Sequence, residues 1–333
     1  MKNKQIKIME KSRKLSFNYD LSNLPVYNTY GSDMLIKSIL GLTLPKYATI
    51  RPNLKGTTEK VGFVTNNVIL QDLSCGFDPT GATTQNLVTV DLCNKKVNQQ
   101  LCPYELYDTY LSQSLTNANF QESVPFEQQI ADLKVKQIQQ RIEQQLWQNT
   151  TAGGGCFNGF ALLISQSTGN TYASAVASSS GTTFSSSAAY GSAGNPITEV
   201  DKLINVLDDN AMSRDDLRVF MSYANFRLYV QALTRANFFQ NYIGSTDVTG
   251  MMEAIHPNTN VKVIPTIGLN GSAQVTIGPA EYMVVGFDLL SDHEKLTIWY
   301  SKDFDELRLR ANYNYGATIA TFGTTKYFAT NGL

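Results

Sequence analysis

The residues that most often carry enzyme chemistry and bind metal ions are scarce in this sequence. Its 333 residues include two histidines and four cysteines, with no Cys-x-x-Cys pair, so no zinc site of the usual spacing is predicted. No Gly-x-Ser-x-Gly elbow is present, and no Gly-Lys-Ser/Thr follows the glycines at 153–155, which argues against a hydrolase nucleophile and a phosphate loop. The chain is therefore expected not to be an enzyme and to need no cofactor or metal.

Charged residues are also few. They make up 17% of the chain, below the roughly 25% of ordinary soluble domains, and the formal net charge is −1. A near-neutral chain argues against tight gripping of nucleic acid, which depends on many Lys and Arg contacts to phosphate.

Long apolar runs are missing as well. No run approaches 18 residues, so no span of a membrane is predicted, and the basic start is not followed by the apolar stretch of a secretory signal. We therefore expect the chain to be cytosolic where it is made. Its cysteines are expected to be buried, reduced thiols: Cys75, Cys93, Cys102 and Cys156.

Positive charge gathers at the start of the chain, against a single Glu10. One interpretation is a solvated, mobile terminus; the other is an arm that contacts nucleic acid or an acidic neighbouring subunit. The basic residues are Lys2, Lys4, Lys7, Lys11, Arg13 and Lys14.

The first half of the chain predicts an arm, a hairpin and a helix. Residues 1–45 lack sustained periodicity and predict an N-terminal arm. Residues 46–92 alternate strand-like pieces with turn residues, which predicts an extended β-hairpin with a polar tip. A two-stranded hairpin is marginal alone in water, so it needs a partner surface, such as another copy. The hairpin pieces are Tyr47–Ile50, Val61–Val64, Val68–Leu70 and Leu87–Leu92.

Residues 124–149 predict the clearest helix. Ser123 can cap its start, Pro125 suits its first turn, and its length would be about 39 Å at ~1.5 Å per residue. Such a helix is long for a compact enzyme domain and could serve as a spine. Its apolar stripe is Phe126, Ile130, Leu133, Ile138, Ile142 and Leu146.

The second half changes character twice. Residues 151–196 are rich in Ser and Gly and predict an exposed loop or insertion, with a short strand or helix at Phe160–Ile164. Residues 197–290 then alternate amphipathic helices with buried strands. Near the end, Leu296–Tyr300 and the period-two alternation at 307–315 predict a hairpin, and the fold class is α+β.

Polar residues in this half are expected to lie in loops. His256 and His293 are predicted to be loop histidines, and Asp208-Asp209 and Asp215-Asp216 to be solvated turn residues. Asp303 and Asp305 fit a hairpin turn, with a salt bridge to another subunit as the alternative.

The order of these parts resembles the tailed-bacteriophage major capsid proteins, which have the Hong Kong 97 fold. The most similar local stretches are Lys295–Asp303 followed by Glu306–Arg310, and the passage from Val90 through Asn98 and Cys102 to Leu106. The resemblance implies an axial domain at 197–290 and a peripheral domain at 93–150 and 291–333. It also implies that 46–92 reaches onto a neighbouring subunit. Candidate contacts between subunits are Lys55, Lys60, Asp303, Asp305, Arg308 and Arg310.

The same resemblance implies a protein that self-assembles into pentamers and hexamers of an icosahedral shell around double-stranded DNA, without sequence specificity. Its other partners would be portal, scaffolding, and decoration or head-completion proteins, with the scaffold encoded separately. Assembly would take place in the bacterial cytoplasm, and the product would be the virion capsid. The alternatives are an encapsulin-type compartment around enzyme cargo, a soluble α+β enzyme, and a secreted adhesin, which the absence of a signal sequence disfavours.

Overall fold

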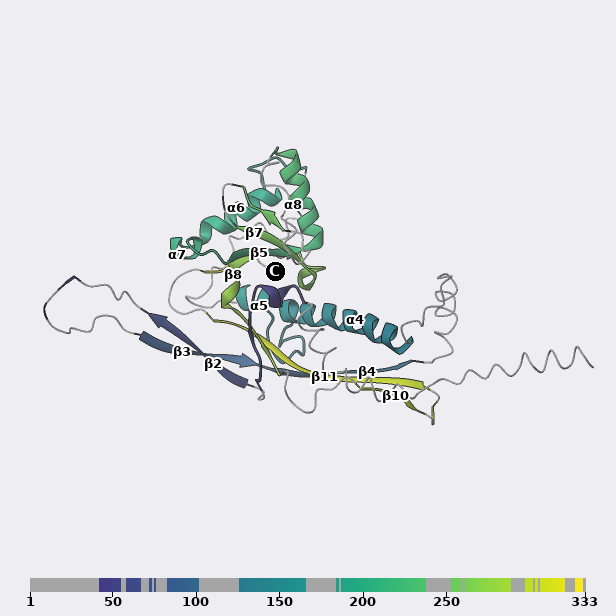
Figure 1. The fold of residues 1–333 in the computed structure, drawn as a ribbon. Coiled ribbons are helices and arrows are strands. Elements are labelled where there is room, and N and C mark those ends of the chain that lie inside the picture. The colour runs from purple at the N-terminus through teal and green to yellow at the C-terminus, as the bar shows by residue number, and fades with distance from the viewer. Residues whose placement is uncertain are drawn as a thin grey trace, which may run out of the picture.

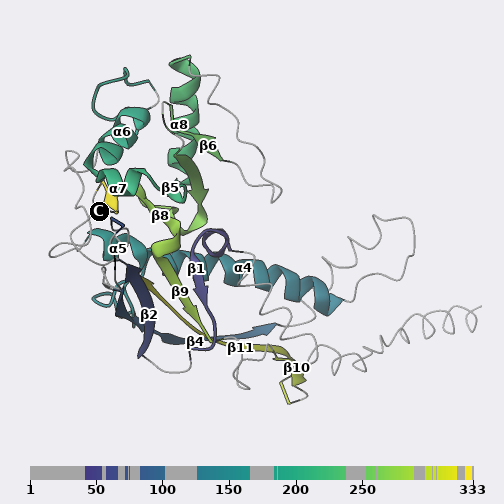
Figure 2. The same cartoon turned by 60° about the vertical axis from the view of Figure 1, so that its left-hand side comes forward.

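The chain folds around two β-sheets and one long helix, shown in Figures 1 and 2. The structure is a computed structural model. It describes residues 42–54, 58–66, 72–73, 75, 83–101, 126–165, 184–185, 187–237, 253–257, 259, 261–288, 297–301, 303–304, 306–320 and 327–331.

The first sheet is built on one long strand. Strand β11 pairs antiparallel with β4 along one edge, and with β10 and then β9 along the other; β1 pairs parallel with β9. Its members are β1 (Thr49–Arg51), β4 (Cys93–Leu101), β9 (Met283–Phe287), β10 (Thr297–Ser301) and β11 (Glu306–Ile319).

The long helix α4 (Phe126–Gln148) is close to the predicted helix at 124–149 and packs on this sheet. The buried apolar side chains of β11 recur at every second residue, as predicted, because alternate residues of a strand point to the same face. They meet Ile138, Ile142 and Leu146 of the helix in one core cluster, whereas Leu133 of the predicted stripe is exposed. The buried apolar residues of β11 are Leu309, Ala311, Tyr313, Tyr315, Ala317 and Ile319.

The second sheet forms the upper part of Figure 1. Its order is β12-β8-β5-β7-β6, with β5 and β7 parallel. Helices α6 and α8 cover one face, and their starts are capped by Asn195 and Ser222, which accept backbone N–H groups of the first turn. The elements are α6 (Pro196–Val206), α7 (Asp209–Met212), β5 (Leu217–Ser222), α8 (Tyr223–Arg235), β6 (Ala254–Ile255), β7 (Lys262–Thr266), β8 (Thr276–Pro279) and β12 (Ala329–Thr330).

The two sheets meet where the end of α4 contacts the short helix η4 (Ile267–Leu269). Trp147 is fully buried, with its ring 5.8 Å from that of Phe160 and 5.2 Å from that of Phe220 on β5. A Cβ on Gly268 would collide with the Trp147 ring, so this backbone approach requires glycine. Gln148 completes the joint by donating to the carbonyl of Gly268 at 2.6 Å.

A hairpin of β2 (Thr58–Asn66) and β3 (Thr83–Asp91) projects away from both sheets in Figure 1. It runs in register from Thr58↔Asp91 to Asn66↔Thr83, within the predicted range. Tyr47–Ile50 was predicted to belong to it, but β1 lies in the first sheet beside β9. That pairing is parallel and joins residues more than 200 positions apart, so no local pattern reveals it.

Other boundaries also differ from the prediction. Strand β9 was assigned to the domain at 197–290 and β12 to the one at 291–333, yet β9 lies in the first sheet and β12 in the second. The predicted exposed insertion at 151–196 contains core residues. Phe157 and Phe160, at the start of helix α5 (Phe160–Ser165), are buried against the first sheet, because aromatic burial outweighs the small-residue composition around them.

The cysteine prediction is wrong for three residues. Cys93, at the start of β4, forms a disulfide with Cys156, with Cα atoms 5.4 Å apart, and Cys75 is exposed. The 63-residue separation hid the pairing, which the fold creates by setting the segment after α4 beside β4. Cys102 lies outside the described residues.

We expect Cys93→Ser to lower the free energy of unfolding of the oxidised protein by about 2–4 kcal/mol, because the cross-link restricts the unfolded chain. Urea unfolding of both proteins, with and without dithiothreitol, measures this. Cys75→Ser is the matched control and should leave the unfolding midpoint unchanged. Equal midpoints for the wild type in both redox conditions would contradict the prediction.

Candidate functional site

No constellation of catalytic or metal-binding residues emerges from the part of the chain that the structure describes. Within it, no group of three His, Cys, Asp or Glu side chains could hold a metal ion. Nor does any helix there have the length and apolar content of a membrane span. The polar clusters that do form connect segments of the fold that are distant in sequence.

His256 stands between Asp201 and Tyr229. Its Nε2 lies 2.8 Å from Asp201 Oδ1, and its Nδ1 lies 2.8 Å from the Tyr229 hydroxyl. The predicted loop histidine is therefore a fully buried one, with both ring nitrogens engaged. Burial raises the pKa of Tyr229, which keeps the hydroxyl protonated. Neither ring reaches a surface where a substrate could bind, so the cluster ties α6, α8 and β6 together.

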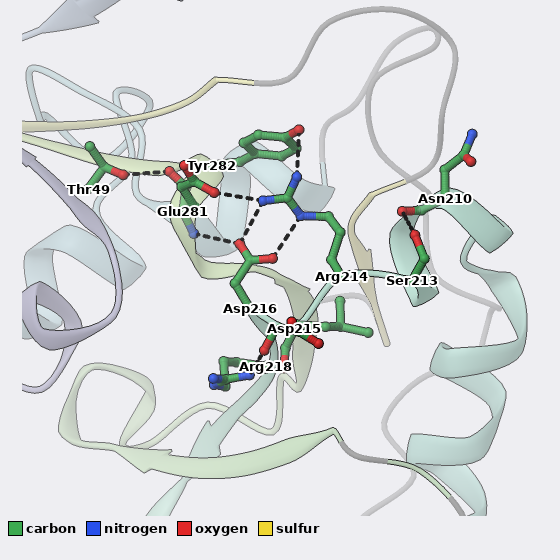
Figure 3. A network of polar contacts seen from close by, with 10 residues as sticks. Thr49, Asn210, Ser213, Arg214, Asp215, Asp216, Arg218, Glu281 and Tyr282 are labelled. Carbon is green, nitrogen blue, oxygen red and sulfur yellow. Dashed lines mark hydrogen bonds and ion pairs between the residues drawn. The ribbon is translucent and has the colours of Figure 1, made fainter. Parts of the chain in front are cut away.

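Arg214 organises a second cluster, which Figure 3 shows from close by. Its Nε and Nη2 donate to the two oxygens of Asp216 at 2.7 and 3.0 Å, Nη2 also meets Glu281 at 2.8 Å, and Nη1 donates to the Tyr282 hydroxyl at 3.0 Å. Burial opposes ionisation of Asp216, but the hydrogen bonds and charge of Arg214 outweigh it, so the pKa of Asp216 is lowered. Asp216 lies in a turn, as predicted, but it is half-buried and paired with Arg214 rather than solvated.

The Arg214 cluster has a structural role. Arg214 and Asp216 precede β5 of the second sheet, whereas Glu281 and Tyr282 lie in the short helix η5 (Ala280–Tyr282), directly before β9 of the first. The contacts of Arg214 with Glu281 and Tyr282 therefore tie the start of β5 to the segment that crosses from the second sheet to the first, while the bidentate pair with Asp216 fixes the guanidinium.

Glu143 connects three segments at the joint. It is 3% exposed; one carboxylate oxygen accepts the Thr43 backbone N–H at 3.0 Å and the other accepts the Thr266 hydroxyl at 2.5 Å. Burial raises its pKa, and the two hydrogen bonds only partly oppose this. Helix α4, the chain before β1 and the end of β7 thus meet on a single carboxyl group.

The predicted contact residues fall into two separate places. Lys60 is exposed on β2 of the projecting hairpin. Asp303, Arg308 and Arg310 lie together at the far end of the first sheet, in or beside the β10–β11 turn. The rest lie outside the described residues: Lys55, Asp305, Lys2, Lys4, Lys7, Lys11, Arg13 and Lys14, together with His293.

Two aromatic residues at this turn were not predicted as site residues. Trp299 is 40% exposed and Phe304 is 64% exposed, and the Arg308 guanidinium lies 4.7 Å from the centre of the Phe304 ring. In the sequence, these two residues could have been noticed as aromatic residues close to a turn rich in acidic residues.

Comparison with solved structures finds chains with a similar arrangement of helices and strands. A chain in the structure of the satellite phage P4 procapsid including size determination (Sid) protein aligns with a TM-score of 0.55 at 11% identity, over 90% of this chain and 98% of that one. A chain in the structure of Mycobacterium phage Bobi aligns with a TM-score of 0.52 at 12% identity, over 87% and 89%. No protein-family model and no curated protein matches the sequence.

These alignments cover most of the length of all three chains. The chain therefore has the α+β Hong Kong 97-like fold found in tailed-phage capsids, and the predicted fold class is confirmed. At such low identity, shared architecture rather than shared residues carries the likeness.

The joint should respond to pH through Glu143. Because its pKa is raised, the folded state keeps a proton that the unfolded state has lost. The contribution of Glu143 to stability is therefore full at low pH and is lost as pH rises through the folded pKa. The limiting slope is about 1.4 kcal/mol per pH unit. Urea unfolding of the wild type and Glu143→Gln is measured between pH 4 and 8. The free energy of unfolding of the wild type should fall relative to that of the variant as pH rises. A difference independent of pH would contradict this.

Proposed function

We propose that this chain is the major capsid protein of a tailed bacteriophage, which assembles into pentamers and hexamers of an icosahedral shell around double-stranded DNA. The observation that carries the proposal is the match to a procapsid chain over 98% of that chain's length, so that almost all of that chain's architecture has a counterpart in this one. The virion capsid would be its location, after assembly in the bacterial cytoplasm.

The projecting hairpin supports the proposal physically. Its two strands pair only with each other among the described residues, and Leu87 on β3 is 58% exposed. Such a ribbon gains stability by lying on another surface, and a neighbouring subunit offers one at every position of a shell. The domain roles follow: an axial domain around the second sheet, a peripheral domain around α4 and the first sheet, and the hairpin as the extended arm.

A near-neutral chain suits a shell around packed DNA, because a strongly basic lining would bind the DNA along its length. Portal, scaffolding, and decoration or head-completion proteins would be the other partners. The basic residues between Lys2 and Lys14 are proposed to contact the lumen or nucleic acid.

The first test is expression of the chain with the proteins encoded beside its gene, followed by sedimentation and electron microscopy. Closed shells, and DNA within shells from infected cells, are expected. Shells that hold an enzyme and no genome would replace the proposal with the encapsulin alternative. A stable monomer under all conditions would contradict assembly altogether.

Shortening the hairpin tests its role. Residues 64–85 can be replaced by Asn-Gly, which closes a two-residue turn between the paired positions Phe63 and Asn86. The variant should keep the thermal midpoint of the isolated subunit, since both sheets remain intact, yet form no closed shells in sedimentation. The same replacement with normal shells would show that the hairpin is dispensable for assembly.

A further inference from the structure

A groove runs between α4 and the face of the first sheet on which the helix packs. Its volume is about 280 Å³, and cationic side chains approach it from both walls, with no carboxylate among its described lining residues. Register places Lys95 on the helix-facing side of β4, because it pairs with the buried Tyr313. Lys134 and Arg141 approach from α4.

The two cations from the helix have neutral partners among the described residues. Lys134 Nζ lies 3.4 Å from Gln137 Oε1, and Arg141 Nη1 lies 3.4 Å from Gln144 Oε1, both within the helix. Like charges that share a groove repel one another, so an anion placed there would be stabilised by all of them. The floor includes Ile138 and Tyr313, which favours a ligand that brings an apolar surface together with its negative charge.

The same chain carries a segment of this chemistry. The β10–β11 turn presents Asp303, which is exposed, then the exposed ring of Phe304, and Glu306 follows at the start of β11. The sequence adds Asp305 between them. Arg308 lies 3.7 Å from Glu306 and also over the Phe304 ring, so the exposed Asp303 is the described carboxylate of the turn that complements the cationic groove in charge.

The turn does not serve the groove of its own subunit. Phe304 precedes Tyr313 by nine residues, and most of that interval is the extended strand β11. At ~3.3 Å per residue, about 30 Å separate the turn from the middle of the groove. A contact between them must therefore join two copies, in a heterologous arrangement in which each copy offers a different surface.

We propose that the acidic turn Asp303–Glu306 of one copy docks into the cationic groove of a second copy, with Asp303 facing Lys95, Lys134 and Arg141 and with Phe304 against the groove floor. This proposal rests on the proposed assembly into a shell. Nucleic acid is the less suitable occupant, because the groove is bounded by a helix on one side and a sheet on the other and has an apolar floor. It is one of the outcomes of the test.

Charge reversal tests the pairing. Asp303→Lys or Lys134→Glu alone places like charges together and should reduce the yield of closed shells roughly tenfold at low salt. Combining the two substitutions should restore the yield. The matched control is Lys136→Glu, an exposed position of α4 that does not line the groove, and its shells should form normally. Failure of the double variant to recover, with each single variant folded, would overturn the proposal.

Carbodiimide cross-linking of wild-type shells gives a readout without any substitution. It joins touching carboxylates and amines directly, so peptides holding Asp303 should become linked to peptides holding Lys95 or Lys134. Shells assembled from equal amounts of ¹⁴N- and ¹⁵N-labelled subunits should yield mixed-label links in mass spectrometry. Shells without these links would overturn the docking proposal and leave the capsid function standing, whereas absence of any shell would reject the capsid function itself. Normal shells of Lys134→Glu with reduced DNA content would assign the groove to nucleic acid and overturn the proposal.

Discussion

The seating of Trp147 against Gly268 holds the two halves of this protein together. The indole contacts Phe160 and Phe220, the latter on the second sheet, and the missing Cβ of Gly268 lets the backbone of η4 approach the helix. Around this apolar contact lie the buried carboxyl of Glu143 and, farther along the crossing, the Arg214 cluster. The polar groups depend on the packing, because a charge-assisted network gains its strength only where neighbouring side chains exclude water.

The elements that could be predicted from the sequence are those with a clear hydrophobic periodicity. The stripe through Ile138, Ile142 and Leu146 and the alternation along 307–315 predicted α4 and β11, because one side of each element is buried. Pairings between distant segments were missed: β1 with β9, β12 with β8, and Cys93 with Cys156. No local pattern encodes these contacts, since each depends on where the whole chain has already been placed. His256 lies in a loop and Asp216 in a turn, as predicted, but the sequence did not predict the burial of His256 between Asp201 and Tyr229 or the pairing of Asp216 with Arg214.

The proposed function, assembly into a shell, does not call for a single site. The features that bear on this proposal are the hairpin, the acidic turn and the cationic groove, which occupy different parts of the surface. Lys60, Asp303, Arg308 and Arg310 were predicted as contact residues from the resemblance to capsid proteins. Their grouping in space, and the exposure of Phe304 beside Arg308, could be seen only in the folded structure. Because charged residues make up only 17% of the chain, the local groups of like charge at the turn and in the groove stand out from the rest of the sequence.

Strands β3 and β4 are separated by a single residue, Leu92, and form almost one continuous strand from the projecting hairpin into the first sheet. Where the two strands join, Gly316 leaves space for the Asp91 carbonyl, and Gly286 leaves space for the side chains of Leu54 and, less closely, Leu92. The hairpin strand β3 therefore passes directly into β4, which is hydrogen-bonded to β11 in the first sheet. A pull on the hairpin from outside would be felt as tension along the central strand of the sheet under α4.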